Sequence, residues 1–587
     1  MLKLLKNVTK KQCLLAMVCF ALVIIQVWLE LKMPDYMSEI TQLVQTEGSQ
    51  MKDILINGGY MLLCAFGSLV AAVITGYITS IISSKFSMTI RKKIFEKVEN
   101  LSMNEVKSFS TSSLITRTTN DVTQIEMLIA MGLQLLIKSP ITAIWAVTKI
   151  LNKSWQWSAV TGVAVGVLLT VVVILMIIVL PRFKRVQKLI DKLNSVTREN
   201  LTGIRVVRAF NAEEYQEKKF DEANKNLTNQ QLFNQRVFAV MQPVMYIVMY
   251  MVTLSIYFIG AYLIDSATMG DKIALFGNMI VFSSYAIQVI MSFLMLAMIF
   301  MMLPRAQVSA NRINEVLDTE ISIKDGKIKE NTTKEVGIVE FKNVYFKYPD
   351  ADEYLLENIS FKANKGDTVA FIGSTGSGKS TLINLVPRFY DATEGEVLVD
   401  GVDVKNYTQE FLHNKIGYVP QKAVMFNGTV SSNIAYGDNG KEKASAEIIK
   451  KAIEVAQGKD FVEKMDDTYE AHIAQGGTNV SGGQKQRLAI ARAIARNPEI
   501  YIFDDSFSAL DYKTDSVLRK ELKKYTKDAT SLIVAQRIGT IMNADQIIVL
   551  DEGKIVGKGT HKELLKNCDV YKQIALSQLS KEELENE

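Results

Sequence analysis

The chain has 587 residues, 48% of them hydrophobic, with a formal net charge of +5 and four cysteines. This length is too great for a single domain, and so small a net charge gives no indication of a nucleic-acid partner. The cysteines are scattered and form no metal-type spacing, so we expect reduced thiols without a chemical role. Long apolar runs dominate the first half of the chain, whereas the second half is typical of a soluble α/β protein.

Six apolar runs in the first half are long enough to cross about 30 Å of hydrocarbon. They cover residues 13–33, 58–83, 126–150, 157–181, 237–264 and 273–303. Lysines 3, 6, 10 and 11 precede the first run and predict a cytoplasmic N-terminus. That run is too long for a signal peptide and lacks a small-residue cleavage site, so we interpret it as a retained helix. An even number of spans returns the second half to the cytoplasm.

The loops between the spans differ in length and charge, as this topology requires. Short outer loops with few Lys or Arg are predicted near 34–57, 151–156 and 265–272. The inner segments 84–125 and 182–236 are long and basic, and they are predicted to be helical extensions of the spans with a break at 210–215. Such extensions either carry motion from the soluble half to the membrane or are solvated stalks.

Ionisable side chains are scarce within the predicted spans. Glu30 and Glu126 fall at predicted edges, and Lys138 in the third span is the one such group expected at some depth. A charge inside a membrane indicates a function by default, and the alternative is a lysine that reaches back to the interface.

Methionines recur at helical spacing in the last two spans. They are Met241, Met245 and Met249, followed by Met291, Met295, Met298 and Met302. Their soft side chains either line a cavity for varied apolar ligands or pack against neighbouring helices and lipid.

The second half contains a glycine-rich turn between an apolar strand at 367–372 and a helix. The sequence Gly373-Ser374-Thr375-Gly376-Ser377-Gly378-Lys379-Ser380 fits the P-loop pattern and is followed by Thr381. Its glycines let backbone N–H groups surround phosphate oxygens, Lys379 would reach the β- and γ-phosphates, and Ser380 would ligate Mg²⁺. The alternative is a strand–helix turn without a ligand. We predict a nucleoside triphosphate site, with residues 374–381 holding the phosphates.

Further polar residues follow predicted strands on either side of this turn. Tyr348 is placed to stack on adenine, and Gln421 ends the strand at 416–421, where it could touch Mg²⁺ or its water. The strand at 500–505 delivers Asp504 and Asp505 at its carboxyl end, and the strand at 531–536 ends in Gln536. The turn Ser481-Gly482-Gly483-Gln484 opens a helix, which makes it a candidate anion site.

These motifs, in this order, resemble the ATPase domain of ABC transporters, and Val480-Ser-Gly-Gly-Gln-Lys-Gln-Arg487 is the most specific of them. Six spans fused ahead of the domain resemble the half-transporters of the type IV exporter architecture. The segments 114–121 and 203–210 match the inner loops of that group, which by resemblance hold coupling helices that dock on the ATPase domains. The resemblance implies ATP and Mg²⁺ as ligands, with Ser380, Gln421 and Asp504 around the metal. It also implies head-to-tail pairing of two ATPase domains, so that Ser481 to Gln484 would close the partner's ATP site.

The sequence departs from the family pattern at two catalytic positions. Asp505 stands where the family usually has Glu, and this places the carboxylate about 1.5 Å further back. Gln536 stands where the family usually has His, and an amide cannot carry positive charge. Gln475 replaces another usual Glu, and Val480 replaces the usual Leu before the signature.

The paired substitution is similar to the degenerate-site subunit of heterodimeric multidrug-type exporters, in which hydrolysis occurs mainly at the partner's site. We therefore predict an ATP-driven exporter half for a hydrophobic or amphipathic substrate, working with a non-identical half in the cell membrane. A homodimer with two slow sites is one alternative, and an ATP-sensing regulatory or channel-like subunit is another. The predicted organisation is a membrane α-helical domain at 1–320, a linker at 321–337, a soluble α/β P-loop ATPase domain at 338–577 and a polar tail at 578–587.

Overall fold

The structure, a computed structural model, describes residues 1–46, 48–151 and 155–579. The chain divides into two compact units, one of Met1–Glu99 with Ser110–Thr319 and the other of Asn100–Phe109 with Glu320–Glu587. The polar tail expected at 578–587 lies outside the described residues from position 580 onward, and positions 152–154 of the outer loop expected at 151–156 lie outside them too.

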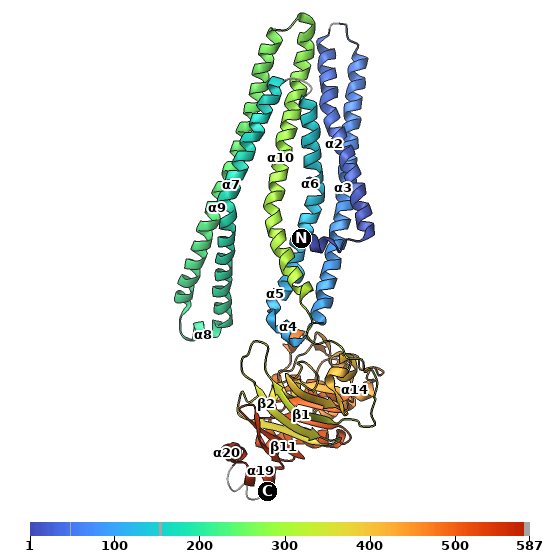
Figure 1. The fold of residues 1–587 in the computed structure, drawn as a ribbon, viewed down its shortest axis with the longest axis vertical. Helices are drawn as coiled ribbons and strands as arrows, with labels where there is room; N and C mark the ends of the chain where they lie inside the picture. The colour runs from blue at the N-terminus through green and yellow to red at the C-terminus, as the bar shows by residue number, and fades with distance from the viewer. Residues whose placement is uncertain (47, 152–154, 580–587) are drawn as a thin grey trace. The chain divides into compact units, whose positions relative to one another are not determined.

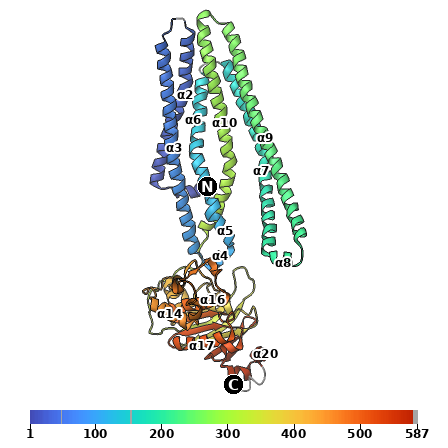
Figure 2. The ribbon, with the colours of Figure 1, turned by 180° about the vertical axis from the view of Figure 1, so that it is seen from behind.

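The first unit is built from long helices that run side by side, with α7 and α9 forming a hairpin whose tip is α8 (Figures 1 and 2). Its helices are α1 (Leu2–Leu5), α2 (Lys10–Gln45), α3 (Met51–Glu99), α5 (Thr111–Thr116), α6 (Val122–Leu151), α7 (Trp155–Thr202), α8 (Ile204–Ala209), α9 (Glu213–Asp265) and α10 (Met269–Asp318). Six helical segments in the described residues are long and apolar enough to cross a membrane, which confirms the six predicted spans.

Several of these helices extend further than the sequence predicted. α2 continues through Pro34 to Gln45 and α3 begins at Met51, so most of the outer loop predicted near 34–57 is helical. α10 starts at Met269, inside the loop predicted at 265–272, and runs past Pro304 to Asp318. Proline removes one N–H donor and clashes with one carbonyl of the preceding turn, but long helices packed on their neighbours accommodate this loss.

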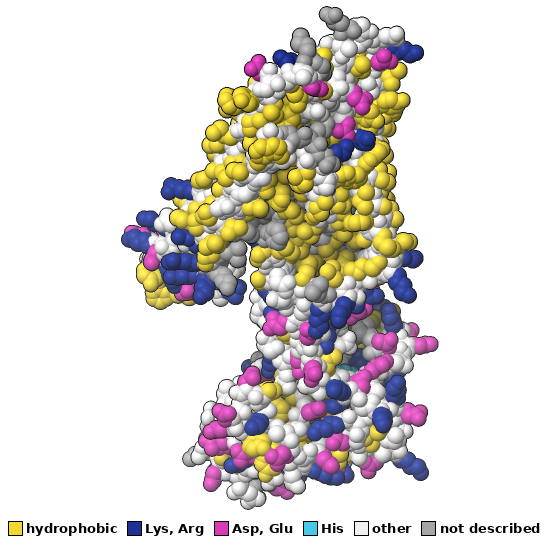
Figure 3. Space-filling model, turned by 45° about the horizontal axis from the view of Figure 1, so that its top comes forward, with side chains coloured by type: hydrophobic (Ala, Val, Ile, Leu, Met, Phe, Trp, Pro, Cys, Tyr) yellow, Lys and Arg dark blue, Asp and Glu magenta, His cyan; other side chains and the backbone are white. Residues whose placement is uncertain are grey.

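A continuous core joins α2, α6, α7, α9 and α10, and large buried side chains such as Leu31, Trp157, Phe282 and Tyr285 fill it. The opposite faces of these helices are apolar as well, and hydrophobic side chains cover much of this unit in Figure 3. Phe66 and Phe258, for example, are 65% and 78% exposed. Apolar side chains over so broad a surface suit contact with lipid.

The two methionine series have different surroundings. Met241 and Met245 of α9 are half-buried and pack against the helical core. Met291 and Met298 of α10 are exposed. The packing explanation therefore holds for the first two residues, and the α10 residues present soft side chains at the surface of the described chain.

The second unit contains a six-stranded sheet in the order β12-β11-β3-β10-β9-β6, in which the five strands β11 to β6 run parallel and β12 is antiparallel. A four-stranded antiparallel sheet has the order β2-β1-β4-β5. The strands are β1 (Val339–Phe346), β2 (Leu356–Ala363), β3 (Thr368–Gly373), β4 (Glu394–Val399), β5 (Val402–Asp403), β6 (Ile416–Val419), β9 (Ile500–Asp504), β10 (Thr530–Val534), β11 (Gln546–Asp551) and β12 (Lys554–Gly559). A separate pair is formed by β7 (Gly428–Thr429) and β8 (His472–Ile473).

The second unit also contains eleven α-helices among its described residues. They are α4 (Met103–Ser108), α11 (Lys379–Asn384), α12 (Gln409–Asn414), α13 (Val430–Ile434), α14 (Ala446–Val455), α15 (Lys459–Val462), α16 (Gly482–Ala495), α17 (Tyr512–Tyr525), α18 (Ile538–Ile541), α19 (His561–Asn567) and α20 (Asp569–Gln578). Strands β9 and β10 are buried along their whole length, as their uninterrupted apolar sequences predict for a parallel sheet covered on both faces. The architecture confirms the predicted fold class of a membrane helical domain fused to an α/β ATPase domain.

Candidate active site

Four neighbouring parallel strands deliver the predicted polar residues to one edge of the six-stranded sheet. β3, β10, β9 and β6 are adjacent in this order. The P-loop follows β3, Gln536 lies two residues beyond β10, Asp504 and Asp505 come at the end of β9, and Gln421 lies two residues beyond β6. Because the carboxyl ends of parallel strands meet at one edge, residues separated by more than 150 positions in sequence become neighbours.

The P-loop has the backbone shape that its glycines predict. Gly376 and Gly378 have φ angles of 88° and 90°, and a Cβ at Gly378 would lie 2.6 Å from the side chain of Leu356. The ammonium of Lys379 donates to the carbonyls of Gly373 and Ser374 at 3.0 and 2.6 Å and to Ser377 Oγ at 3.2 Å. Burial lowers the pKa of Lys379, while the charges of the two aspartates after β9 act in the opposite sense. The loop therefore holds a cation against two of its own carbonyls and one hydroxyl, and this ammonium suits a phosphate chain bound in the loop.

Hard oxygen ligands lie directly beside this loop. The hydroxyl of Ser380 donates to Asp504 Oδ1 at 2.7 Å. Burial raises the pKa of Asp504, and the hydrogen bond from Ser380 partly offsets this. A serine hydroxyl and a carboxylate at this separation suit Mg²⁺, which prefers one or two protein oxygens together with phosphate and water.

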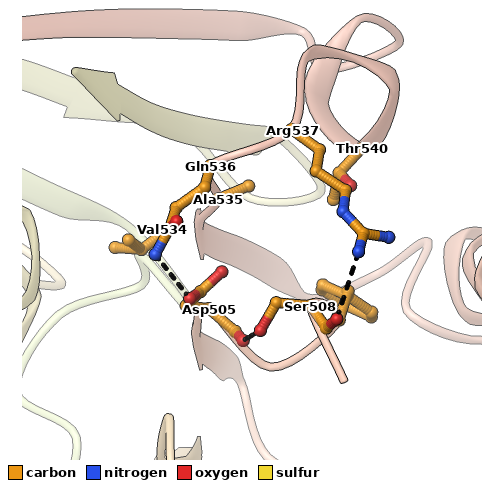
Figure 4. Close-up of a pocket in the computed structure, with 8 residues that line it drawn as sticks. Asp505, Ser508, Val534, Ala535, Gln536, Arg537 and Thr540 are labelled. Carbon is orange, nitrogen blue, oxygen red and sulfur yellow. Dashed lines mark hydrogen bonds between the residues drawn. The ribbon is translucent and has the colours of Figure 1, made fainter. Parts of the chain in front are cut away.

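Asp505 is held by both glutamines that the sequence singled out. Gln536 Nε2 donates to Asp505 Oδ2 at 2.8 Å, and Gln421 Nε2 donates to the same oxygen at 3.2 Å. Figure 4 shows the amide of Gln536 pointing at the carboxylate of Asp505. The backbone of Asp505 is left-handed, with φ of 45°, and its side chain is only 8% exposed. Because Gln421 uses its nitrogen here, its Oε1 is left as the atom that could face a metal or its water.

An aromatic cluster lies on the other side of the loop. Tyr348 makes a 3.0 Å hydroxyl contact with Thr381 Oγ1, and its ring lies at 90° to that of Tyr390 with the centroids 5.4 Å apart. The ammonium of Lys107, in α4, lies 4.9 and 5.0 Å from the centroids of these two rings. A hydrogen bond with Tyr390 raises the pKa of Lys107. Sequence reasoning missed Lys107 and Tyr390, because a lysine in a short polar helix gives no pattern that connects it to a tyrosine more than 200 residues away.

The signature residues form a different kind of structure. Ser481 is the N-cap of α16: its Oγ accepts from the backbone N–H of Gln484 at 3.3 Å, and Gln484 Oε1 accepts from the backbone N–H of Ser481 at 2.8 Å. This reciprocal pair is a capping box. Ser481 and Gly482 are exposed, so the start of a 14-residue helix is presented at the surface. The turn is rigid and accessible, as a docking point for an anion on another molecule must be.

Comparisons with known proteins address the whole chain. Residues 15–293 match the family model of the ABC transporter transmembrane region, and residues 356–508 match the family model of the ABC transporter. The chain is 40% identical over 521 residues to an uncharacterized ABC transporter ATP-binding protein of Mycobacterium tuberculosis, with 89% of this chain and 87% of that protein covered. The chain belongs to the ABC transporter family.

Further relatives of this ABC transporter cover most of its length. It is 34% identical over 587 residues to the uncharacterized ABC transporter ATP-binding protein YfiB of Bacillus subtilis, with 98% of each chain covered. It is 32% identical over 526 residues to the ATP-dependent lipid A-core flippase of Escherichia coli, with 88% of each chain covered. Its fold is similar to that of a bacterial Atm1-family ABC exporter with ATP bound, with a TM-score of 0.83, 23% identity and coverage of 97% of this chain and 100% of the other.

The comparisons and the helices together establish the general class of this ABC transporter. It is a multi-pass membrane protein and an ATP-hydrolysing transporter, with its membrane and ATP-binding domains fused in one chain. Its fold is that of an exporter half-transporter.

Proposed function

We propose that this ABC transporter is one half of a heterodimeric exporter and that its own ATP site is degenerate. The observation that carries the proposal is the double occupation of Asp505 Oδ2 by the amides of Gln421 and Gln536. The two amides fix the carboxylate by its Oδ2, so an attacking water would have to be held by Oδ1 in the orientation that the amides impose. Aspartate is also one bond, about 1.5 Å, shorter than the usual glutamate, and a misplacement of about 1 Å can reduce a rate a hundredfold.

The same geometry supports tight binding of ATP. Tyr348 would stack on adenine, and the loop residues 374–381 would hold the phosphates, with Lys379 released from its loop carbonyls to the β- and γ-phosphates. Mg²⁺ would lie at Ser380, Asp504 and Gln421, where it would neutralise phosphate charge. The signature Ser481 to Gln484 would complete the partner's site, where most hydrolysis would occur.

The transport cycle follows from these roles. With the N-terminus and the ATPase domain in the cytoplasm, ATP would clamp this domain to that of a non-identical partner, and hydrolysis at the partner's site would separate them. The exposed tip of the α7–α9 hairpin supports docking on a second chain, because Val206 and Phe210 are 60% and 78% exposed there. The broad apolar surface, the exposed methionines of α10 and the lipid-flippase relative favour an amphipathic or hydrophobic substrate.

The decisive experiment purifies the chain with the protein encoded beside it and measures ATP turnover. Asp505→Ala is expected to change the rate of the pair by no more than a few fold, whereas alanine at the partner's matching glutamate should abolish turnover. Equal losses from the two substitutions would contradict the asymmetric assignment. Turnover that no amphipathic compound stimulates would favour a regulatory or channel-like subunit instead.

A further inference from the structure

Two acidic residues of α2 pair with two lysines of α6 inside the helical unit. Glu30 Oε1 lies 2.9 Å from Lys138 Nζ, and Asp35 Oδ2 lies 2.7 Å from Lys149 Nζ. Lys138 is in the middle of the apolar run of α6, and the sequence suggested either a functional charge or a side chain that reaches back to the interface. The structure instead pairs it with Glu30, an acid that the sequence placed at the edge of a span.

The Asp35 pair is complete. Its Oδ2 accepts from Lys149, and its Oδ1 accepts from the hydroxyl of Tyr285 at 2.7 Å. Tyr285 is fully buried in α10. Both carboxylate oxygens are therefore used, and the pair cross-links α2, α6 and α10 without offering anything to a ligand.

The Glu30 pair is incomplete. Lys138 Nζ, Gln26 Nε2 and Ser68 Oγ all donate to the same oxygen, Glu30 Oε1, at 2.9, 2.9 and 3.1 Å. Within the described part of the chain, no group donates to the other carboxylate oxygen, Oε2. Gln26 Oε1 likewise accepts no hydrogen bond from the described residues, although Gln26 is only 4% exposed.

A third unused oxygen lies on the same side of α6. Thr142 follows Lys138 by one helical turn, so it shares the face that meets α2. Its hydroxyl is buried and has no partner among the described residues. Thr142 lies on the Lys149 side of the Glu30–Lys138 pair, whereas Gln26 precedes Glu30 by one helical turn on the other side. The amide of Gln26, which is hydrogen-bonded to Glu30, is therefore the neighbour of this carboxylate. Buried acceptors are nearly always satisfied in proteins, so Gln26 Oε1 calls for a donor from outside the chain, and the 25% exposure of the Glu30 side chain lets such a donor reach its Oε2.

We propose that Glu30 and Gln26 form a binding subsite for a head group that donates hydrogen bonds, with a primary ammonium as its best occupant. A primary ammonium carries three N–H donors, so it can serve the unused oxygens of both Glu30 and Gln26, and Lys138 and Ser68 keep Glu30 oriented. The proposal rests on the exporter function, because it treats this head group as part of the transported amphiphile.

The test uses the full chain in discs of phosphatidylcholine, a lipid whose head group has no N–H donor. Dodecylamine is the probe, and dodecyltrimethylammonium, with the same chain and charge but no N–H, is its matched comparison. Binding is measured without ATP, as the saturable rise in Tm with probe concentration. We expect dodecylamine to bind about tenfold or more tightly than the trimethyl compound, and Glu30→Gln and Gln26→Leu each to weaken it by about tenfold or more.

Asp35→Asn is the matched control, since it breaks the complete ion pair in the same helix. It should lower the Tm without probe and leave the affinity for dodecylamine within about twofold. The subsite assignment is wrong if Asp35→Asn weakens binding as much as Glu30→Gln. It is also wrong if the trimethyl compound binds as well as dodecylamine, which is the result expected if ordered waters satisfy these oxygens. A different outcome separates the site from the proposed function. If binding depends on Glu30 but no amphiphile changes the ATP turnover of the two-chain complex, the exporter function is refuted and the site is retained.

Discussion

The sharpest prediction concerns restoration of hydrolysis at the chain's own ATP site. Asp505→Glu combined with Gln536→His should raise its turnover by about a hundredfold, because the longer side chain recovers about 1.5 Å of reach and a misplacement of about 1 Å costs that factor. Gln536→His also removes the amide that occupies Asp505 Oδ2 at 2.8 Å. Each single substitution should gain less, since Asp505→Glu leaves this amide in place and Gln536→His leaves the carboxylate short.

The substitution has a structural cost that can be measured separately. Asp505 has φ of 45°, a left-handed conformation that Asp tolerates better than Glu. We therefore expect a loss of up to about 1 kcal/mol in the free energy of unfolding, seen as a lower Tm. The assay is single-turnover hydrolysis of ATP in the two-chain complex, with the partner's glutamate changed to glutamine to silence its site. A restored pair that binds ATP fully and hydrolyses it no faster than the parent would refute the reasoning.

Three further predictions test other contacts of the ATPase unit. Lys107→Met should lower the free energy of local opening of residues 100–109 by about 1–2 kcal/mol, the sum of two cation–π contacts. Hydrogen exchange in this segment should accelerate about fivefold to thirtyfold. Lys92→Met, at an exposed position, should leave the exchange unchanged. Lys415→Met should destabilise the ATPase unit by about 3–5 kcal/mol, measured by calorimetry, because it leaves the buried Asp400 and the half-buried Glu499 without their shared cation. A loss below about 1 kcal/mol would contradict this expectation. Burial lowers the pKa of His413 below its usual 6.5, so the unfolded chain binds the proton first and stability should fall as the pH drops below about 6.5. His413→Gln should flatten this part of the Tm–pH curve. An unchanged curve would show that other groups cause the loss of stability.

The sequence predicted those features whose physical cause is local. A six-residue apolar strand, three closely spaced glycines and a lysine predict the P-loop, because glycine takes the positive φ angles of this turn most readily. The uninterrupted apolar runs before Asp504 and Gln536 likewise predicted buried parallel strands. Adjacency of these strands then brought Asp505 and Gln536 within hydrogen-bonding distance, which the alignment of strand ends made foreseeable.

The features that escaped prediction depend on pairings between distant elements. Glu30 was placed at a span edge because the apolar run of α2 ends there, whereas the helix continues through Pro34 and packs against Lys138. The sequence also gave no indication that Asn100–Phe109 belongs to the ATPase unit, since the contact of Lys107 with two tyrosines is set by tertiary packing. Helix ends were missed for a related reason: residues 34–45 are polar enough for a loop, but α2 continues through Pro34 to Gln45.

The unbroken course of α3 has a mechanical consequence. Its 49 residues extend for about 74 Å as one continuous helix without an internal proline. A tilt of about 5° around one end would displace the other by about 6 Å, roughly the height of one helical turn. A continuous helix of this length therefore converts a small rotation near one end into a displacement of about 6 Å at the other.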